Sequence, residues 1–205
     1  MSNKLILIVH GEPNSTFSEI LFKYFKSKKF KTDKKKIVVI GSHNLFLKQM
    51  KLLKYHIKFN EVSDLKSAIV GKINIYNINF DFKSTFSTIS EKSNKYIERC
   101  FDCALKLIKK NNVQALINGP ISKKHFLKKK YPGITEYIAN KTNSKNPVML
   151  IYNNNLSVNP LSTHIPIKNV SKYIKKKKII NNVLKICDFY KSKLKKIPHI
   201  AVLGL

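Results

Sequence analysis

The sequence LILIV at Leu5–Val9 decides the fold. A run of consecutive apolar residues without polar alternation is typical of a parallel strand that is buried on both faces. A helix is expected over 17–28, followed by a second apolar strand over 37–40. A helix over 44–55 and a third strand over 57–59 continue the alternation. This order of strands and helices predicts a parallel sheet with helices on its faces.

Two helix starts are expected from capping boxes. In such a box a Ser or Thr side chain and a Glu three residues later satisfy backbone N–H groups that the helix leaves free. Thr16 with Glu19 marks the start of the first helix. Thr88 with Glu91 marks a helix that should run to about Lys110.

The remaining elements are assigned from apolar periodicity and from Gly, Pro and Asn clusters. They are a half-exposed strand over 73–78, a buried strand over 113–117, helices over 121–130, 135–141 and 171–195, strands over 148–152 and 156–158, and a last strand over 200–205.

The composition is strongly basic. The formal net charge is +29, with 40 Lys+Arg against 11 Asp+Glu. Such a charge is typical of proteins that bind nucleic acid or an anionic membrane. However, Arg99 is the only arginine, and nucleic-acid readers usually use the bidentate fork of arginine. Abundant Lys, Asn and Ile are the residues that AT-rich codons encode, so solvated lysine faces are the simpler interpretation.

Compartment and targeting features indicate a cytoplasmic protein. Three cysteines in a chain of 205 residues favour a reducing compartment. The N-terminus does not resemble a signal peptide, and no apolar run is long enough to span a membrane. Cys100 and Cys103 form a C-x-x-C pair, but no second pair completes a zinc site, and both lie on or beside the apolar stripe of a helix. Core packing is therefore their expected role.

His164 is the histidine most strongly placed for chemistry. It follows the strand expected over 156–158 and precedes Pro166, which puts it at a strand end, where sites in α/β sheets usually lie. Imidazole is a common metal ligand and a general acid or base near neutral pH. Taken alone, a histidine before a proline is more often a hydrogen-bonded loop residue. Loop residues are also the interpretation for the others, which lack Cys or carboxylate partners at ligand spacing: His10, His43, His56, His125 and His199.

Four short motifs fall at expected strand ends or in the loops beyond them. They are Gly-Glu-Pro at 11–13, Asn-Gly-Pro-Ile-Ser-Lys at 118–123, Gly-Ile-Thr-Glu at 133–136 and Ser-Thr-His-Ile-Pro at 162–166. In order and spacing they resemble the 4-hydroxythreonine-4-phosphate dehydrogenase family of pyridoxal phosphate (vitamin B6) biosynthesis. The resemblance covers the whole chain, which corresponds to the N-terminal half and a little more of a family member.

The resemblance implies a three-layer α/β/α fold with a mostly parallel sheet, similar to isocitrate and isopropylmalate dehydrogenases. Residues 1–120 would belong to one domain and residues 121–205 to a second. The family acts as a homodimer, with NAD or NADP as cofactor. It oxidises and decarboxylates a small phosphorylated amino acid, 4-phosphooxy-threonine. A divalent metal, which could be zinc, magnesium or cobalt, is held by three histidines. His164 matches the first metal ligand, and Thr135 matches a residue that contacts the substrate.

The departures from the family pattern predict weak or absent activity. Ser15, Phe17 and Ser18 replace two glycines and a proline of the family's first loop, and Ile134 replaces a substrate-binding histidine. The chain stops at Leu205, just before the family's Asn-Pro-His-Ala-Gly segment, so the C-terminal part is expected to be missing. The leading hypothesis is a truncated or split dehydrogenase. A non-catalytic remnant or a subunit that needs a C-terminal partner is the second, and a basic nucleic-acid-binding protein is the third.

Overall fold

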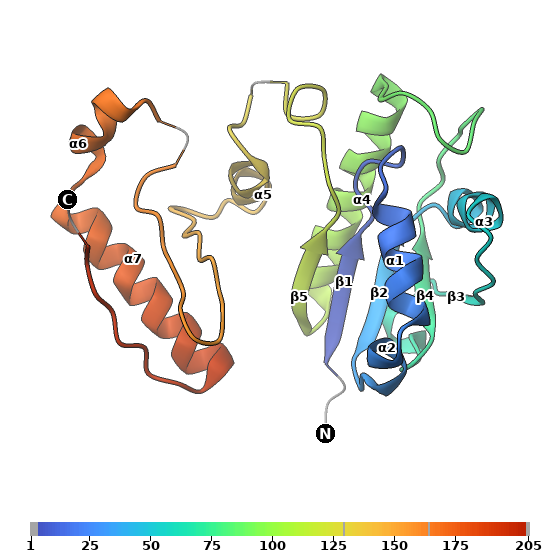
Figure 1. Cartoon of the computed structure of the whole chain (residues 1–205), viewed down its shortest axis with the longest axis horizontal. Coiled ribbons are helices and arrows are strands. Elements are labelled where there is room, and N and C mark those ends of the chain that lie inside the picture. Colours follow the sequence, from blue (N-terminus) through green and yellow to red (C-terminus); the bar gives the residue numbers. More distant parts are fainter. Residues whose placement is uncertain (1–3, 129, 164, 204–205) are drawn as a thin grey trace. The chain divides into compact units, whose positions relative to one another are not determined.

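A computed structural model describes residues 4–128, 130–163 and 165–203 of the chain (Figure 1). The chain divides into two compact units, with the division between Lys130 and Tyr131. The domain limits implied by the family resemblance, 1–120 and 121–205, concern a complete enzyme and stay a prediction.

A parallel sheet forms the centre of the first unit and confirms the α/β fold. Within the described residues its strand order is β3-β4-β2-β1-β5. Every pair of neighbouring strands is parallel. The strands are β1 (Leu5–Val9), β2 (Lys36–Gly41), β3 (Phe59–Glu61), β4 (Ile73–Asn77) and β5 (Val113–Asn118).

Helices cover the two faces of this sheet, as the alternating pattern predicts. They are α1 (Phe17–Lys26), α2 (Lys28–Thr32), α3 (His43–Leu52) and α4 (Glu91–Lys110). Figure 1 shows α1 and α4 on opposite faces of the sheet. One apolar core joins alternate strand residues with aromatic and aliphatic residues of the helices: Ile8, Leu21, Phe22, Phe25, Phe30, Ile37, Val39, Phe46, Ile73 and Ile75.

The two predicted capping boxes are wrong in detail. Thr16 precedes α1 but makes no side-chain cap bond, and Glu19 instead pairs with Lys23 at 2.8 Å. Helix α4 is capped by Ser90, whose Oγ accepts from Ser93 N at 3.3 Å, while Ser93 Oγ accepts from Ser90 N at 3.0 Å. Two serines thus form the reciprocal box two residues beyond Thr88. The end of α4 at Lys110 is as predicted.

Strand exposure also differs from prediction, because it depends on sheet order. Strand β4 lies between β3 and β2, so its residues 73–75 are buried and the strand is not half-exposed. Strand β5 is at an edge of the described sheet, and Ile117 is 45% exposed, so the predicted buried strand is wrong. Strand β3 begins at Phe59, where the predicted strand 57–59 was to end. The described residues of 121–130 form turns and not the predicted helix.

The second unit carries α5 (Ile134–Lys141), α6 (Val170–Tyr173) and α7 (Lys176–Phe189), followed by a π-helical turn over 190–194. Helix α5 matches the prediction closely. The predicted helix over 171–195 is broken, because the backbone is extended at Ile174 and Lys175.

The strands predicted for the second unit do not form in its described residues. The two predicted over 148–158 reduce to one antiparallel bridge between Ile151 and Val158. Residues 200–203 have no regular structure, and Leu203 is 91% exposed. An apolar run becomes a strand only when a neighbouring strand pairs with it, and the described residues offer none here. Residues 204–205 of that predicted strand lie outside the described residues.

The backbone contact between the loops after β1 and β5 yields a stability prediction. A Cβ on Gly119 would collide with the carbonyl of His10 and with the Phe17 ring. Gly119→Ala should therefore lower the free energy of unfolding by about 3 kcal/mol, measured by urea unfolding followed by circular dichroism.

Gly71→Ala is the matched control for this substitution. Gly71 has a φ of +74° and no atom near its potential Cβ, so alanine there meets backbone strain without a collision. Its cost should be about 1 kcal/mol. A loss at Gly119 no larger than the loss at Gly71 would contradict the steric explanation.

Candidate functional site

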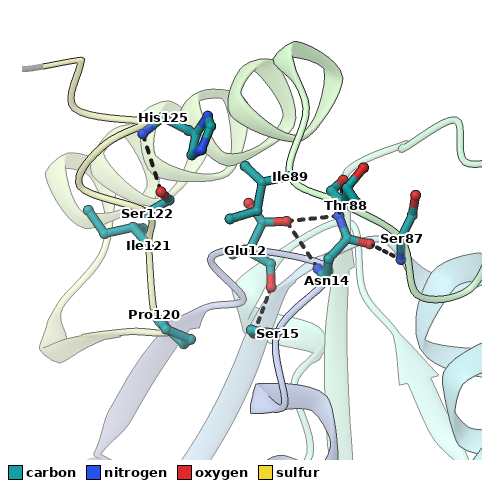
Figure 2. A pocket seen from close by; sticks show the side chains of 10 residues that line it. All are labelled: Glu12, Asn14, Ser15, Ser87, Thr88, Ile89, Pro120, Ile121, Ser122 and His125. Carbon is teal, nitrogen blue, oxygen red and sulfur yellow. Dashed lines mark hydrogen bonds between the residues drawn. The ribbon is translucent and has the colours of Figure 1, made fainter.

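An open pocket of about 630 Å³ lies where the loops after β1 and β5 meet the segment before α4 (Figure 2). Ligands of open parallel sheets usually bind at the carboxyl ends of the strands, and both β1 and β5 end here. The lining residues come from three separate parts of the chain, all in the first unit. They are Glu12, Asn14, Ser15, Ser87, Thr88, Ile89, Pro120, Ile121, Ser122 and His125.

The two strand-end loops cross in close backbone contact. Gly119 N donates to Val9 O at 2.8 Å, and Glu12 N donates to Pro120 O at 2.8 Å. Gly11 has a φ of +76°, and a Cβ at this position would strike the Gly119–Pro120 backbone. The two loop backbones therefore approach each other closely at Gly11 and Gly119. The resemblance predicts that such close approach is lost at Ser15 and Phe17, which replace glycines of the family.

Glu12 and Asn14 form the polar part of the pocket. Glu12 Oε1 accepts from Asn14 N at 3.1 Å and from Asn14 Nδ2 at 2.9 Å. Asn14 Oδ1 accepts from Ser87 N at 2.8 Å, and Asn14 Nδ2 also lies 3.3 Å from Thr88 O. Asn14 therefore fastens the segment before α4 to the loop after β1, and Figure 2 shows these bonds around Glu12.

A buried hydrogen-bond network lies behind these loops. Gln49 Nε2 donates to Pro13 O at 2.8 Å and lies 3.3 Å from Thr85 O. Its Oε1 accepts from Ser18 Oγ at 2.6 Å. Gln49 thereby holds the loop after β1 and the segment before α4 at the same time.

The network fixes the tautomer of His10. Ser18 donates its hydroxyl hydrogen to Gln49, so Ser18 Oγ must accept from His10 Nε2, 2.8 Å away. The proton of the neutral ring is then on Nε2, which leaves Nδ1 as an acceptor for Tyr96 OH at 3.4 Å. Tyr96 OH in turn accepts from Ser42 N at 2.8 Å.

His10 lies in the loop after β1, as predicted, but its environment is not that of an ordinary loop residue. Its side chain is fully buried, and its ring centroid lies 4.4 Å from that of Phe46. Desolvation by burial lowers the pKa of His10 from 6.5 to about 3, so the ring is neutral. Its partners Ser18 and Tyr96 come from other elements, and no local spacing in the sequence indicates this arrangement.

Two further predictions about single residues have different outcomes. Cys100 is fully buried, and desolvation raises the pKa of its thiol to about 12, which confirms the predicted core role. His43 was expected to lack a carboxylate partner, but its Nδ1 lies 2.9 Å from Glu61 Oε2. His43 is the first residue of α3 and Glu61 the last of β3, and their proximity cannot be inferred from spacing along the chain, so the pair was missed.

Of the two residues predicted from the family resemblance, Thr135 is among the described residues. Thr135 lies in the first turn of α5 in the second unit, and it is half-buried. His164, the predicted metal ligand, lies outside the described residues. Within the described residues, no group of three His, Cys, Asp or Glu side chains could hold a metal ion. The described part of the chain therefore does not by itself fit the three-ligand metal site that the resemblance implies.

The fold and the pocket define an α/β protein with a parallel sheet and an open pocket at the carboxyl ends of its strands. The PdxA family, described as pyridoxal phosphate biosynthetic protein PdxA, matches residues 33–205. The chain belongs to this family. None of the helices in the described part of the chain is long and apolar enough to cross a membrane.

Individual relatives agree with the family match. The chain is 31% identical to the 4-hydroxythreonine-4-phosphate dehydrogenases of Sulfurihydrogenibium sp. (strain YO3AOP1) and Aquifex aeolicus (strain VF5), covering 98% and 99% of this chain and 62% and 63% of theirs. The crystal structure of the 4-hydroxythreonine-4-phosphate dehydrogenase from Burkholderia phymatum has the same fold, with a TM-score of 0.82 at 19% identity over 96% of this chain and 61% of that one. The chain thus spans about three fifths of the length of the relatives it matches.

The buried His10 yields a prediction about pH. Between its folded pKa of about 3 and its unfolded value of 6.5, the unfolded chain binds a proton that the folded chain does not. The free energy of unfolding should therefore fall as the pH is lowered through this window, with His10 contributing up to about 5 kcal/mol. Urea unfolding at a series of pH values measures this dependence.

His10→Gln isolates the contribution of the imidazole, because its amide can donate to Ser18 but does not titrate. The variant should be less stable at neutral pH, and its stability should fall less steeply on acidification. Equal slopes in the two proteins would show that His10 is not the source of the acid sensitivity.

Proposed function

We propose that this chain contributes to a 4-hydroxythreonine-4-phosphate dehydrogenase of pyridoxal phosphate biosynthesis. The observation that carries the proposal is the family match over 33–205, together with relatives of that activity aligned over nearly the whole chain. In the proposed reaction, the substrate hydroxyl is oxidised with NAD or NADP as hydride acceptor, and the resulting β-keto acid loses carbon dioxide. The substrate is a small phosphorylated amino acid.

Two positions are assigned roles in this proposal. Thr135 offers its hydroxyl to the substrate from the first turn of α5, next to Ile134, which stands where the family has a histidine. His164 would supply one of three ligands to a divalent zinc, magnesium or cobalt ion. The described residues contain no group of three His, Cys, Asp or Glu side chains that could complete this set.

The 205-residue chain alone is proposed to have little or no turnover. One histidine cannot hold a catalytic metal, since such sites use about three protein ligands. Replacement of the family histidine by Ile134 also removes a hydrogen bond to the substrate. Activity would then require ligands from another polypeptide segment. Cytoplasmic location is part of the same proposal, and the free thiols of Cys100, Cys103 and Cys187 fit a reducing compartment.

A second candidate, a subunit that needs a partner polypeptide, is favoured by the surface of the second unit. Many of its large apolar side chains are exposed, and exposed apolar patches mark association surfaces. The most exposed are Ile151, Leu156, Ile167, Leu184, Ile197, Val202 and Leu203, each above 60%. A second copy of the chain, as in the homodimer that the resemblance implies, and a separate polypeptide are both possible partners.

An assay of the purified chain tests the proposal. With 4-phosphooxy-L-threonine, NAD or NADP and each divalent metal, the chain alone should form no measurable NADH or NADPH, while the Aquifex aeolicus relative serves as positive control. Adding a polypeptide that covers the last two fifths of that relative should restore turnover. Robust turnover by the chain alone would refute the predicted inactivity, and no turnover after the addition would count against the proposed reaction in this chain.

Thr135→Val tests the substrate contact in the restored enzyme. Loss of the hydroxyl should raise the KM for 4-phosphooxy-L-threonine about ten-fold, as expected for one hydrogen bond to a charged ligand. Thr142→Val is the matched control, because Thr142 lies at the other end of α5 and its Oγ1 bonds to Ile138 O at 2.9 Å. Equal KM values in the two variants would remove Thr135 from the substrate site.

A further inference from the structure

One carboxylate oxygen in the pocket lacks a partner in the fold. Glu12 is only 4% exposed, and its Oε1 accepts hydrogen bonds from both N and Nδ2 of Asn14. Its second oxygen, Oε2, is buried and accepts no hydrogen bond from any described residue. A buried charged oxygen is unfavourable unless it is hydrogen-bonded, so a donor is expected at this position.

No donor of the described chain lies within hydrogen-bond distance of Glu12 Oε2, and the donors nearest to it along the chain bond elsewhere. Asn14 Nδ2 is shared between Glu12 Oε1 and Thr88 O. Ser15 Oγ donates to the backbone carbonyl of Glu12 at 2.7 Å. His125 N donates to Ser122 Oγ at 3.2 Å. The missing donor is therefore better supplied from the pocket than from the described chain.

The pocket around Glu12 has the size and lining of a small-molecule site. Its volume of about 630 Å³ falls within the range of known ligand pockets. Figure 2 shows Glu12, Ile89 and Ser122 among the side chains that line it. Apolar walls from Ile89 and Ile121 stand next to the hydroxyl-bearing Ser87, Thr88 and Ser122. Such a lining orients a ligand by a few polar groups while burying its apolar parts.

We propose that this pocket binds a small molecule through a hydroxyl or amino group that donates a hydrogen bond to Glu12 Oε2. The inference rests on the proposed function for the identity of the ligand, since an amino-acid substrate and the ribose of a nucleotide cofactor both carry such donors. A group with acceptors only, such as a phosphate, is repelled from this point by the carboxylate charge.

Glu12→Gln tests the proposal in the full chain. The two donors of Asn14 keep the amide oxygen on their side, which turns the amide NH2 toward the ligand, so that two donors face each other. Affinity for the donor ligand should fall at least about ten-fold. Calorimetry with O-phospho-L-threonine, which carries an ammonium group, and with NADH, which carries ribose hydroxyls, identifies the source: the probe whose binding depends on Glu12 is the ligand of this site.

Glu19→Gln is the matched control. Glu19 lies in α1, pairs with Lys23 and is not part of the pocket lining, so this variant should bind both probes as the unaltered chain does. A Tm of Glu12→Gln within about 3 °C of the unaltered chain would confirm that the fold is kept. Equal affinity of the Glu12→Gln variant for every bound probe, or binding of neither probe by the unaltered chain, would overturn the proposal.

The outcome is separable from that of the proposed reaction. If a probe binds through Glu12 but the restored enzyme shows no turnover, the site stands and the proposed reaction fails. If the restored enzyme turns over and the Glu12→Gln variant keeps every KM unchanged, the reaction stands and the site fails.

Discussion

The crossing of two backbones at Gly11 and Gly119 is the constraint on which the pocket depends. Sheet order places β5 beside β1, so the loops that leave these strands meet at one edge. Glu12 N bonds to Pro120 O there, and a side chain on either glycine would collide with the opposite loop. The position of Glu12 is therefore determined by the sheet and by the absence of two Cβ atoms. The same contact brings the turn after β5 within reach of any ligand that Glu12 holds.

The polar network behind the loops orders the site and carries an energetic cost. Burying His10, Ser18 and Gln49 removes them from water, and each hydrogen bond recovers only about 1 kcal/mol net. Such a network adds little to stability. It fixes the orientation of the side chains in it, because each hydrogen bond has a set donor and acceptor. Here the hydrogen bonds run from Tyr96 through His10 to Gln49, which ends on the carbonyls of both pocket loops. A charged His10 would reverse one step of this chain, and burial keeps the ring neutral.

Local patterns in the sequence predict the parts of the fold that are locally determined. A parallel α/β sheet could be predicted from the apolar runs of β1 and β2 and from the order of strands and helices. The family could be predicted from the series of short motifs. The exposure of β5 could not be predicted, because it depends on sheet order and on which faces the helices cover. The burial of His10 in a hydrogen-bond network could not be predicted for the same reason: Ser18 lies on α1, Gln49 on α3 and Tyr96 on α4. Glu12 belongs to the Gly-Glu-Pro motif recognised in the sequence. That its Oε2 has no hydrogen-bond partner can be known only from the three-dimensional positions of the surrounding donors.

The departures from the family's glycine-rich first loop have a physical counterpart in this network. Phe17 stands at a family glycine, and its ring stacks on His10 with centroids 6.4 Å apart. Ser18 stands at the family's proline, and its hydroxyl connects His10 to Gln49. The loop loses backbone freedom and gains side-chain contacts that fix it before any ligand arrives. A preorganised loop avoids the ordering cost on binding, so these substitutions can preserve a binding surface by a different physical route. The substitutions in this loop therefore do not by themselves predict a loss of binding.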